Sequence, residues 1–174
     1  KSGGSWCYNW YGNTANYNGV IFKTPDNISS NSSSVTLYHT THNNFNTKII
    51  NISGKPNEYF MLENIGHDGY QAGLDYMIGG NGDTSGIAIW HIDESQSGNS
   101  DYSHKLVDLE EASESGLDLG SHNGKQTNLF YNGNKTEFSN NTNPNSKTYS
   151  GNSSGITINN ISSSGDSMTF DVSF

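Results

Sequence analysis

The chain has 174 residues, a formal net charge of −9 at pH 7 and only 30% hydrophobic residues. All eight of its basic residues are lysines, and they form no basic stripe, so the sequence excludes nucleic-acid binding. No stretch approaches the roughly 20 apolar residues of a membrane-spanning helix, which excludes such a span. Cys7 is the single cysteine, so no disulfide can form within the chain.

The first 34 residues form an aromatic and polar N-terminal segment (1–34). Trp6, Tyr8 and Trp10 alternate along the chain, so they share one face of an expected edge strand. A row of rings of this kind either stacks against sugars or covers a core, and the residues alone leave both interpretations open. The rest of the segment predicts a short strand at 19–23, a turn at 24–27 and a polar loop at 28–34.

Four strands are predicted in the next part of the chain. The runs 35–39 and 47–52 are short and rich in β-favouring residues, and 54–57 is a turn. The two densest apolar runs follow at 58–64 and 85–94. Both carry apolar side chains on both faces, as strands that are buried on both sides do. Because the links are short, these strands are expected to pair as antiparallel neighbours.

Alternation assigns the side chains of the two dense runs to faces. In the first run, Phe60 and Leu62 share one face, and Tyr59 and Met61 share the other. In the second run, one face carries Ile87, Ile89 and Asp93 and the other carries Ala88, Trp90 and Ile92.

The last third of the chain predicts a hairpin. The run 106–112 fits a helix or a strand, and 117–131 is ambiguous. The runs 156–162 and 167–174 form a hairpin across a turn, with Met168, Phe170, Val172 and Phe174 on one face. Many short strands between Asn, Ser and Gly turns predict an all-β, antiparallel β-sandwich-like fold with long Asn/Ser/Gly-rich loops, as one domain over 1–174.

Three blocks in the middle of the chain resemble a known family. They are 58–64 (EYFMLEN), 86–94 (GIAIWHIDE) and 104–112 (HKLVDLEEA). In this order they resemble the segment that follows the catalytic helix of immune inhibitor A-type secreted metalloproteases, and 149–162 is similar to the close of many such proteins. The resemblance implies secretion, a family-like core at 35–112 and a strand within 106–112. The remaining part, 113–174, is expected to consist of loops and the C-terminal hairpin.

By its own residues the chain is not expected to be a protease. Enzymes of this family need His-Glu-x-x-His on a helix, where two imidazoles bind Zn²⁺ and the glutamate is the general base. His39 and His42 have three-residue spacing and lack the glutamate, and the other four histidines, among them His91 and His104, are scattered. Each of these four is expected to be a surface or hydrogen-bonded residue. We therefore expect no zinc in this chain.

Two groups of carboxylates are candidates for a structural Ca²⁺ site. Asp93 and Glu94 end one dense apolar run, and Asp108, Glu110 and Glu111 lie in the third block. Carboxylates packed this closely repel one another unless a cation or hydrogen-bond donors separate them. Ca²⁺ takes oxygen ligands and is one solution in a secreted protein. Hydrogen bonds from backbone N–H groups of loops are the other.

Three functions fit these observations. The first is a non-catalytic, β-rich portion of a secreted metalloprotease-like protein, which supports or shields the catalytic domain of the same precursor. The second is an extracellular structural subunit that assembles with copies of itself through exposed strand edges. The third is a carbohydrate-binding module built on Trp6, Tyr8 and Trp10. Sequons for N-glycosylation stand at Asn27, Asn31, Asn51, Asn134, Asn140, Asn152 and Asn160.

Overall fold

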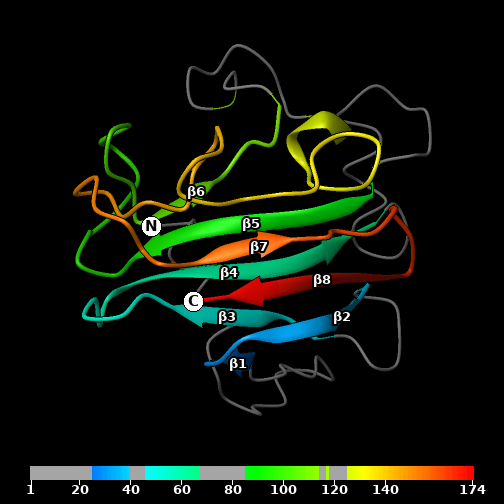
Figure 1. Ribbon diagram of the computed structural model, residues 1–174. Coiled ribbons are helices and arrows are strands. Elements are labelled where there is room, and N and C mark those ends of the chain that lie inside the picture. The colour runs from blue at the N-terminus through cyan, green and yellow to red at the C-terminus, as the bar shows by residue number, and fades with distance from the viewer. Residues whose placement is uncertain (1–24, 40–45, 67–84, 114–116, 118–124) are drawn as a thin grey trace, which may run out of the picture.

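The computed structural model describes residues 25–39, 46–66, 85–113, 117 and 125–174. Trp6, Tyr8, Trp10 and the predicted strand at 19–23 lie outside these residues. The described chain is β-rich and forms two sheets, as the sequence predicts (Figure 1). No helix within the described ranges is long and apolar enough to cross a membrane.

The larger sheet has five strands and the smaller sheet has three. The order in the larger sheet is β1 (Asp26–Ile28), β3 (Lys48–Asn51), β4 (Glu58–Ile65), β5 (Gly86–Asp93) and β6 (Val107–Leu109). The order in the smaller sheet is β2 (Ser32–Tyr38), β8 (Ser167–Ser173) and β7 (Thr157–Asn159). A short 3₁₀ turn, η2 (Gln126–Asn128), follows β6 in the chain. Paired strands are antiparallel, except for β1 and β3.

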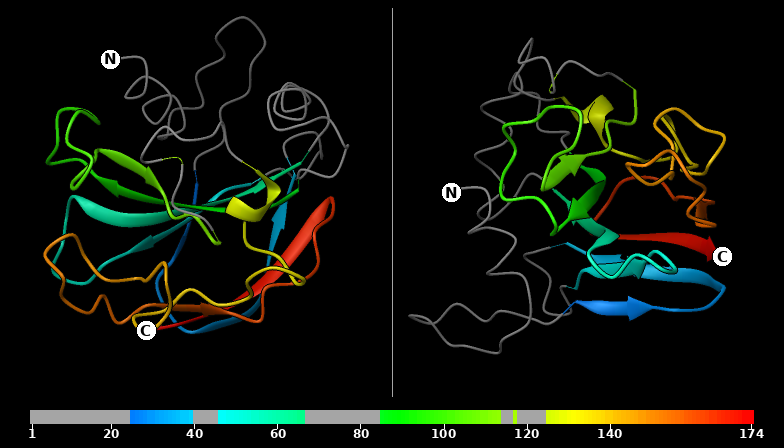
Figure 2. Two further views of the ribbon diagram at one scale, coloured as in Figure 1. Left: turned by 90° about the horizontal axis from the view of Figure 1, so that it is seen from above. Right: turned by 90° about the vertical axis from the view of Figure 1, so that its left-hand side faces the viewer.

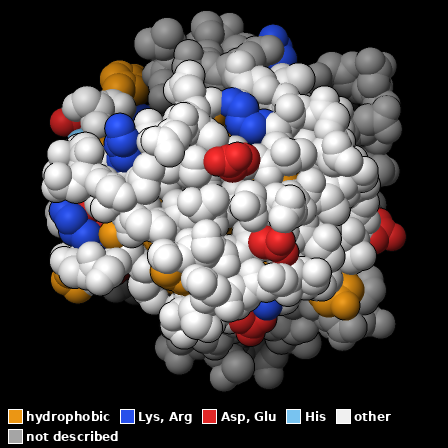
Figure 3. Space-filling view, in the orientation of Figure 1, with side chains coloured by type: hydrophobic (Ala, Val, Ile, Leu, Met, Phe, Trp, Pro, Cys, Tyr) orange, Lys and Arg blue, Asp and Glu red, His pale blue; other side chains and the backbone are white. Residues whose placement is uncertain are grey.

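The two sheets face each other across one main core (Figure 2). The larger sheet contributes Phe60, Leu62 and Ile89, and the smaller sheet contributes Leu37 and Phe170. Burial of this apolar surface is the main stabilising contribution in such a fold. The outer surface seen in Figure 3 is mostly uncharged, with a few charged and apolar side chains scattered over it. The two sheets, packed face to face, form the two-layer, sandwich-like fold that the strand pattern predicts.

The central strands are buried on both faces, which confirms the prediction for the two dense apolar runs. All eight residues of β4 are buried. On the face opposite the main core, Tyr59 and Met61 pack with Ile92 of β5 in a second apolar cluster, against which Trp90 lies half-buried. The alternation read from the sequence therefore assigns these side chains to the correct faces.

Three predictions at the start of the described chain are wrong. β1 lies where a turn is predicted at 24–27, and β2 begins at Ser32, inside the predicted loop at 28–34. β2 also pairs with β8 in the smaller sheet, and not with β3, its expected antiparallel neighbour. The strand that pairs with the free side of β3 is β1, and this pair is parallel. The reason is that the chain leaves the larger sheet after β1, forms β2 in the smaller sheet, and returns as β3, which supplies the long crossover that parallel pairing requires.

The C-terminal hairpin is confirmed, with one exception. β7 and β8 pair antiparallel, and Met168, Phe170 and Val172 of β8 are buried in the main core. Phe174 does not join them, because it lies one residue beyond the end of β8 and is 49% exposed. Its predicted place on the buried face is therefore wrong.

Asparagine side chains cover the outer edges of two strands. On β6, the Val107 N–H donates to Oδ1 of Asn99 over 2.9 Å, and Nδ2 of Asn99 donates to the Val107 carbonyl over 2.8 Å. On β2, Asn46 accepts from the Tyr38 N–H and donates to the Thr36 carbonyl in the same way. Each amide thus pairs with the backbone N–H and C=O groups that a neighbouring strand would otherwise bond. Such groups, when unpaired at a sheet edge, can pair with another chain, and the amide blocks this association.

We expect Asn99→Ala to promote self-association through β6. The substitution removes both bonds to Val107, so it should lower the free energy of unfolding by about 1 kcal/mol and open the edge to pairing. Sedimentation velocity over a range of protein concentrations measures the association, and urea denaturation measures the stability. Asn132→Ala is the control. Asn132 is another exposed asparagine, and its backbone N–H donates to the Ser162 carbonyl. This variant should remain monomeric. An Asn99→Ala variant that is also monomeric at all concentrations would refute the role of the amide.

Candidate functional site

A group of buried and half-buried titratable side chains lies at one end of the larger sheet. Register places Glu58 of β4 opposite Asp93 of β5, and Phe60 opposite His91. Strand alternation turns His91 and Asp93 to the same face as the core residue Ile89. The apolar core therefore ends in a polar layer at this point. We call this layer the acid–imidazole cluster and define it as Glu58, His91, Asp93, His104, Glu110 and Tyr149.

His91 is the centre of the acid–imidazole cluster. The residue is only 3% exposed. Its Nδ1 lies 3.0 Å from Oε1 of Glu110, and its Nε2 lies 3.1 Å from Oε1 of Glu58. An ionised carboxylate can only accept hydrogen bonds, so both contacts form only if the imidazole carries both N–H protons or one glutamate keeps its proton. His91 thus joins Glu110 and Glu58 through its two ring nitrogens.

Glu58 joins the sheet to a distant loop. Its Oε1 also accepts the backbone N–H of Tyr149 over 2.6 Å, across 91 residues of sequence. Lys55 Nζ lies 3.6 Å from the other carboxylate oxygen. Hydrogen bonds to a charged acceptor are stronger than bonds between neutral groups. This buried glutamate consequently fixes the position of the Tyr149 backbone against β4.

The ring of Tyr149 lies between two imidazoles. Its centroid is 4.2 Å from that of His91, with the planes at 16°, and 4.3 Å from that of His104, with the planes at 30°. Burial raises the pKa of the Tyr149 phenol far above its ordinary value, and the nearby carboxylates of Asp108 and Glu110 raise it further. The phenol therefore stays protonated, and the stack is held as a neutral ring between two imidazoles.

His104 and Asp93 form the outer pair of the acid–imidazole cluster. Nε2 of His104 lies 2.7 Å from Oδ2 of Asp93, and the Ser95 N–H donates to Oδ1 over 2.9 Å. Burial by itself raises the pKa of Asp93, but the hydrogen bonds from Ser95 and His104 outweigh burial and hold the pKa below its ordinary value. The folded protein therefore stabilises the ionised form of Asp93.

We expect Asp93→Asn to destabilise the protein in a pH-dependent way. Because the pKa of Asp93 is lower in the folded than in the unfolded chain, its contribution is complete above the unfolded value of about 4 and is lost as the pH falls through the folded value. The variant should lose about 1–2 kcal/mol at pH 7 and differ little from the wild type near pH 2. Urea denaturation at several pH values measures this.

Asp166→Asn is the matched control, because it neutralises an exposed aspartate in the turn between β7 and β8. It should change the stability by less than about 0.5 kcal/mol at any pH. A loss in Asp93→Asn that is the same at pH 7 and pH 2 would contradict the assignment.

The structure gives each predicted calcium ligand a partner from the protein itself. Asp93 binds His104, and Glu110 binds His91, as described above. Glu94 accepts from the Tyr59 hydroxyl over 3.0 Å, Asp108 binds Lys105 Nζ over 2.6 Å, and Glu111 accepts from Asn128 Nδ2 over 3.0 Å. These donors belong mainly to side chains, whereas the alternative to Ca²⁺ expected from the sequence is backbone N–H groups. Within the described ranges, no three His, Cys, Asp or Glu residues form a group that could hold a metal ion.

The predicted glycosylation sites differ in exposure. Five asparagines are exposed: Asn27, Asn31, Asn51, Asn152 and Asn160. Asn134 and Asn140 are half-buried. Nδ2 of Asn134 donates to the carbonyls of Thr127 and Leu129, so a glycan on that nitrogen would disrupt the local fold.

Two residues of the acid–imidazole cluster, Asp93 and Glu110, are predicted from the sequence as calcium ligands. Their partners in the cluster are not predicted. For His91 a signal exists, because it lies on the same strand face as Ile89 and Asp93. For Tyr149 there is none, since it comes from a loop whose position depends on the whole fold. Of the pair with three-residue spacing, His39 is buried and His42 lies outside the described residues.

Fold and site together define a β-sandwich-like protein in which acid and imidazole groups clamp a loop onto the end of the larger sheet. Comparison of the chain with models of protein families, with curated protein sequences and with solved structures finds no match in any of the three.

Proposed function

We propose that the chain is a non-catalytic, β-rich portion of a secreted metalloprotease-like protein, and that it supports or shields the catalytic domain of the same precursor. One observation carries the proposal. All members of the acid–imidazole cluster come from the stretches that resemble the immune inhibitor A-type family. Glu58 belongs to the first block, His91 and Asp93 to the second, His104 and Glu110 to the third, and Tyr149 begins the stretch 149–162.

The positions of the blocks support the same proposal. They coincide with β4, β5 and the segment that contains β6, which are consecutive neighbours in the larger sheet. Stretches far apart in the sequence therefore meet in one packed unit. The acid and base groups of this unit bind one another and hold the loop that carries Tyr149 in place. Contacts of this kind are expected of a structural, non-catalytic role. The side-chain amides on β2 and β6 favour this reading over self-assembly through strand edges.

The test is to express the segment encoded upstream of Lys1 with and without residues 1–174. We expect that segment to contain His-Glu-x-x-His, and to show a higher yield and melting temperature when the chain is attached. The isolated chain should not hydrolyse casein in the presence of Zn²⁺. An upstream segment without the zinc motif, or zinc-dependent proteolysis by the isolated chain, would overturn the proposal.

Calcium binding is the second part of the proposal, with Asp93, Glu94, Asp108, Glu110 and Glu111 as the candidate ligands. An ion at Asp108 would have to compete with the Lys105 ammonium for the same carboxylate. Calorimetric titration of the isolated chain should give heat and a higher melting temperature if Ca²⁺ is a structural ion. If the titration gives no heat and no change in melting temperature, calcium is removed from the proposal and the scaffold role is unaffected.

A further inference from the structure

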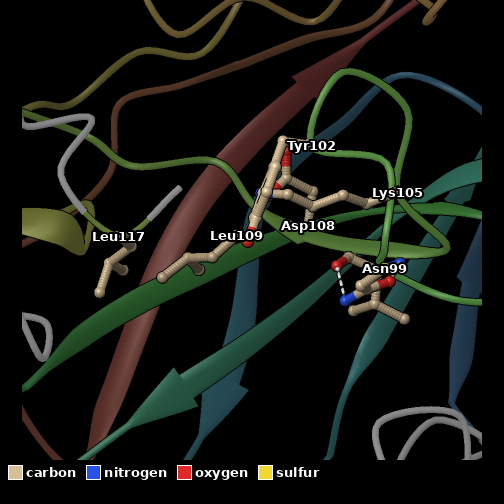
Figure 4. A pocket seen from close by; sticks show the side chains of 7 residues that line it. Asn99, Tyr102, Lys105, Asp108, Leu109 and Leu117 are labelled. Carbon is tan, nitrogen blue, oxygen red and sulfur yellow. Dashed lines mark hydrogen bonds and ion pairs between the residues drawn. The ribbon is translucent and has the colours of Figure 1, made fainter. Parts of the chain in front are cut away.

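A hollow of about 280 Å³ opens at the outer edge of β6 (Figure 4). Its walls combine the polar side chains of Asn99, Lys105 and Asp108 with the apolar side chains of Val107, Leu109 and Leu117, and Tyr102 completes the lining. The volume lies at the lower end of the range for small-molecule sites, where a few polar groups in an apolar wall orient the ligand. A ligand of one ring would fill it.

Tyr102 presents a large aromatic surface to solvent at this hollow. It is 73% exposed, more than any other large hydrophobic side chain in the described part of the chain. The loop that carries it is held in place, since the Ser103 N–H and hydroxyl both donate to Oδ1 of Asp101 and the Leu106 N–H donates to the Gly98 carbonyl. Because the backbone of this loop is fixed, only the side chain of Tyr102 has to be ordered when a ligand covers its ring.

Lys105 and Asp108 supply opposite charges to the same hollow. Lys105 is only 7% exposed, and its Nζ lies 2.6 Å from Oδ1 of Asp108. Because the two charges balance, a ligand with a net charge of either sign would be repelled by one of them. A hydroxyl group suits the pair, since it donates to a carboxylate and accepts from an ammonium.

Asn99 fixes the remaining polar group of the hollow. Both ends of its amide bind the backbone of Val107, as described for the edge of β6, so the amide has one defined orientation. The site therefore offers an exposed aromatic face, together with a carboxylate, an ammonium and an amide that are held by hydrogen bonds. A sugar ring has the matching features, with an apolar C–H face and hydroxyl groups around its rim.

We propose that this hollow binds one ring of a neutral sugar. The C–H face packs against Tyr102, and the ring hydroxyls bind Asp108 and Lys105. The site consists of other residues than Trp6, Tyr8 and Trp10, and it does not depend on the scaffold function proposed above.

Titration of the ¹⁵N-labelled chain with glucose, galactose, mannose and N-acetylglucosamine tests the proposal by NMR. At least one of these sugars should shift the Asn99 side-chain amide signals, with a Kd in the millimolar range. Glucose 6-phosphate should bind more weakly than glucose, because its phosphate meets Asp108. If none of the four neutral sugars shifts these signals at 50 mM, the proposal is overturned.

Three variants locate the binding. Tyr102→Ala should weaken it at least tenfold, and Tyr102→Phe, which keeps the ring, should stay within about threefold of the wild type. Phe174→Ala removes an exposed aromatic ring elsewhere and should leave binding unchanged. Each variant changes an exposed side chain, and the melting temperature confirms that it is folded. Equal affinity of Tyr102→Ala and wild type would refute the assignment.

Discussion

Replacing His91 by phenylalanine is expected to lower the free energy of unfolding by about 3–5 kcal/mol at pH 7, because each buried polar group that is left without its partner costs about 1–3 kcal/mol. Phenylalanine keeps a ring between Phe60 and Tyr149, which His91 contacts at centroid distances of 4.6 and 4.2 Å. It removes both ring nitrogens, so the carboxyl groups of Glu58 and Glu110 lose the imidazole that each of them contacts. Urea denaturation at pH 7 measures the loss.

His104→Phe is the matched control for His91→Phe, since it also keeps a ring against Tyr149. It breaks the bond to Asp93 and a longer contact with Gln96 Nε2, both at a half-buried position. Its loss should be about 1–2 kcal/mol. A loss below about 1 kcal/mol in His91→Phe would contradict the central place given to this imidazole.

Phe138→Ala should lower the free energy of unfolding by about 3–5 kcal/mol, as large-to-small substitutions of buried aromatics do. Phe138 is fully buried, and its ring contacts Phe60 and Phe130 edge-on at centroid distances of 5.2 and 5.8 Å. Its backbone also pairs with Ile158 of β7. The residue thus joins the C-terminal part of the chain to the larger sheet.

The shape of the unfolding curve is the second readout of Phe138→Ala. If residues 1–174 form one domain, a single transition should shift as a whole with an unchanged slope in urea. Two transitions, of which only one shifts, would divide the chain into two units. Phe174→Ala, at an exposed position, should change the stability by less than about 0.5 kcal/mol.

The strands that can be predicted from the sequence are those with a local signal. β4 and β5 are dense in apolar residues on both faces, and β8 alternates cleanly up to Val172. Sheet membership has no such signal. β1 has polar residues that also suit a turn, and its parallel partner β3 is determined by the excursion of the chain through β2.

The candidate site is predictable to a similar degree. The close spacing of Asp108 and Glu110 shows that their charges need compensation, and this holds in the structure. The groups that compensate them are Lys105 and His91, and only the register of β5 against β6 brings His91 to Glu110. The contribution of Tyr149 depends on a contact across 91 residues, which no local pattern encodes.

The place of β8 between β2 and β7 has a consequence for biosynthesis. Ser34 and Asp171 are hydrogen-bonded although 137 residues separate them along the chain. A ribosome that adds about 5–20 residues per second needs roughly 10 s to make the intervening polypeptide. Throughout that time the nascent β2 segment lacks its sheet partner β8, and Leu37 lacks the part of the main core that Phe170 contributes. The smaller sheet therefore forms late, and until then we expect the exposed β2 segment of the growing polypeptide to bind a chaperone.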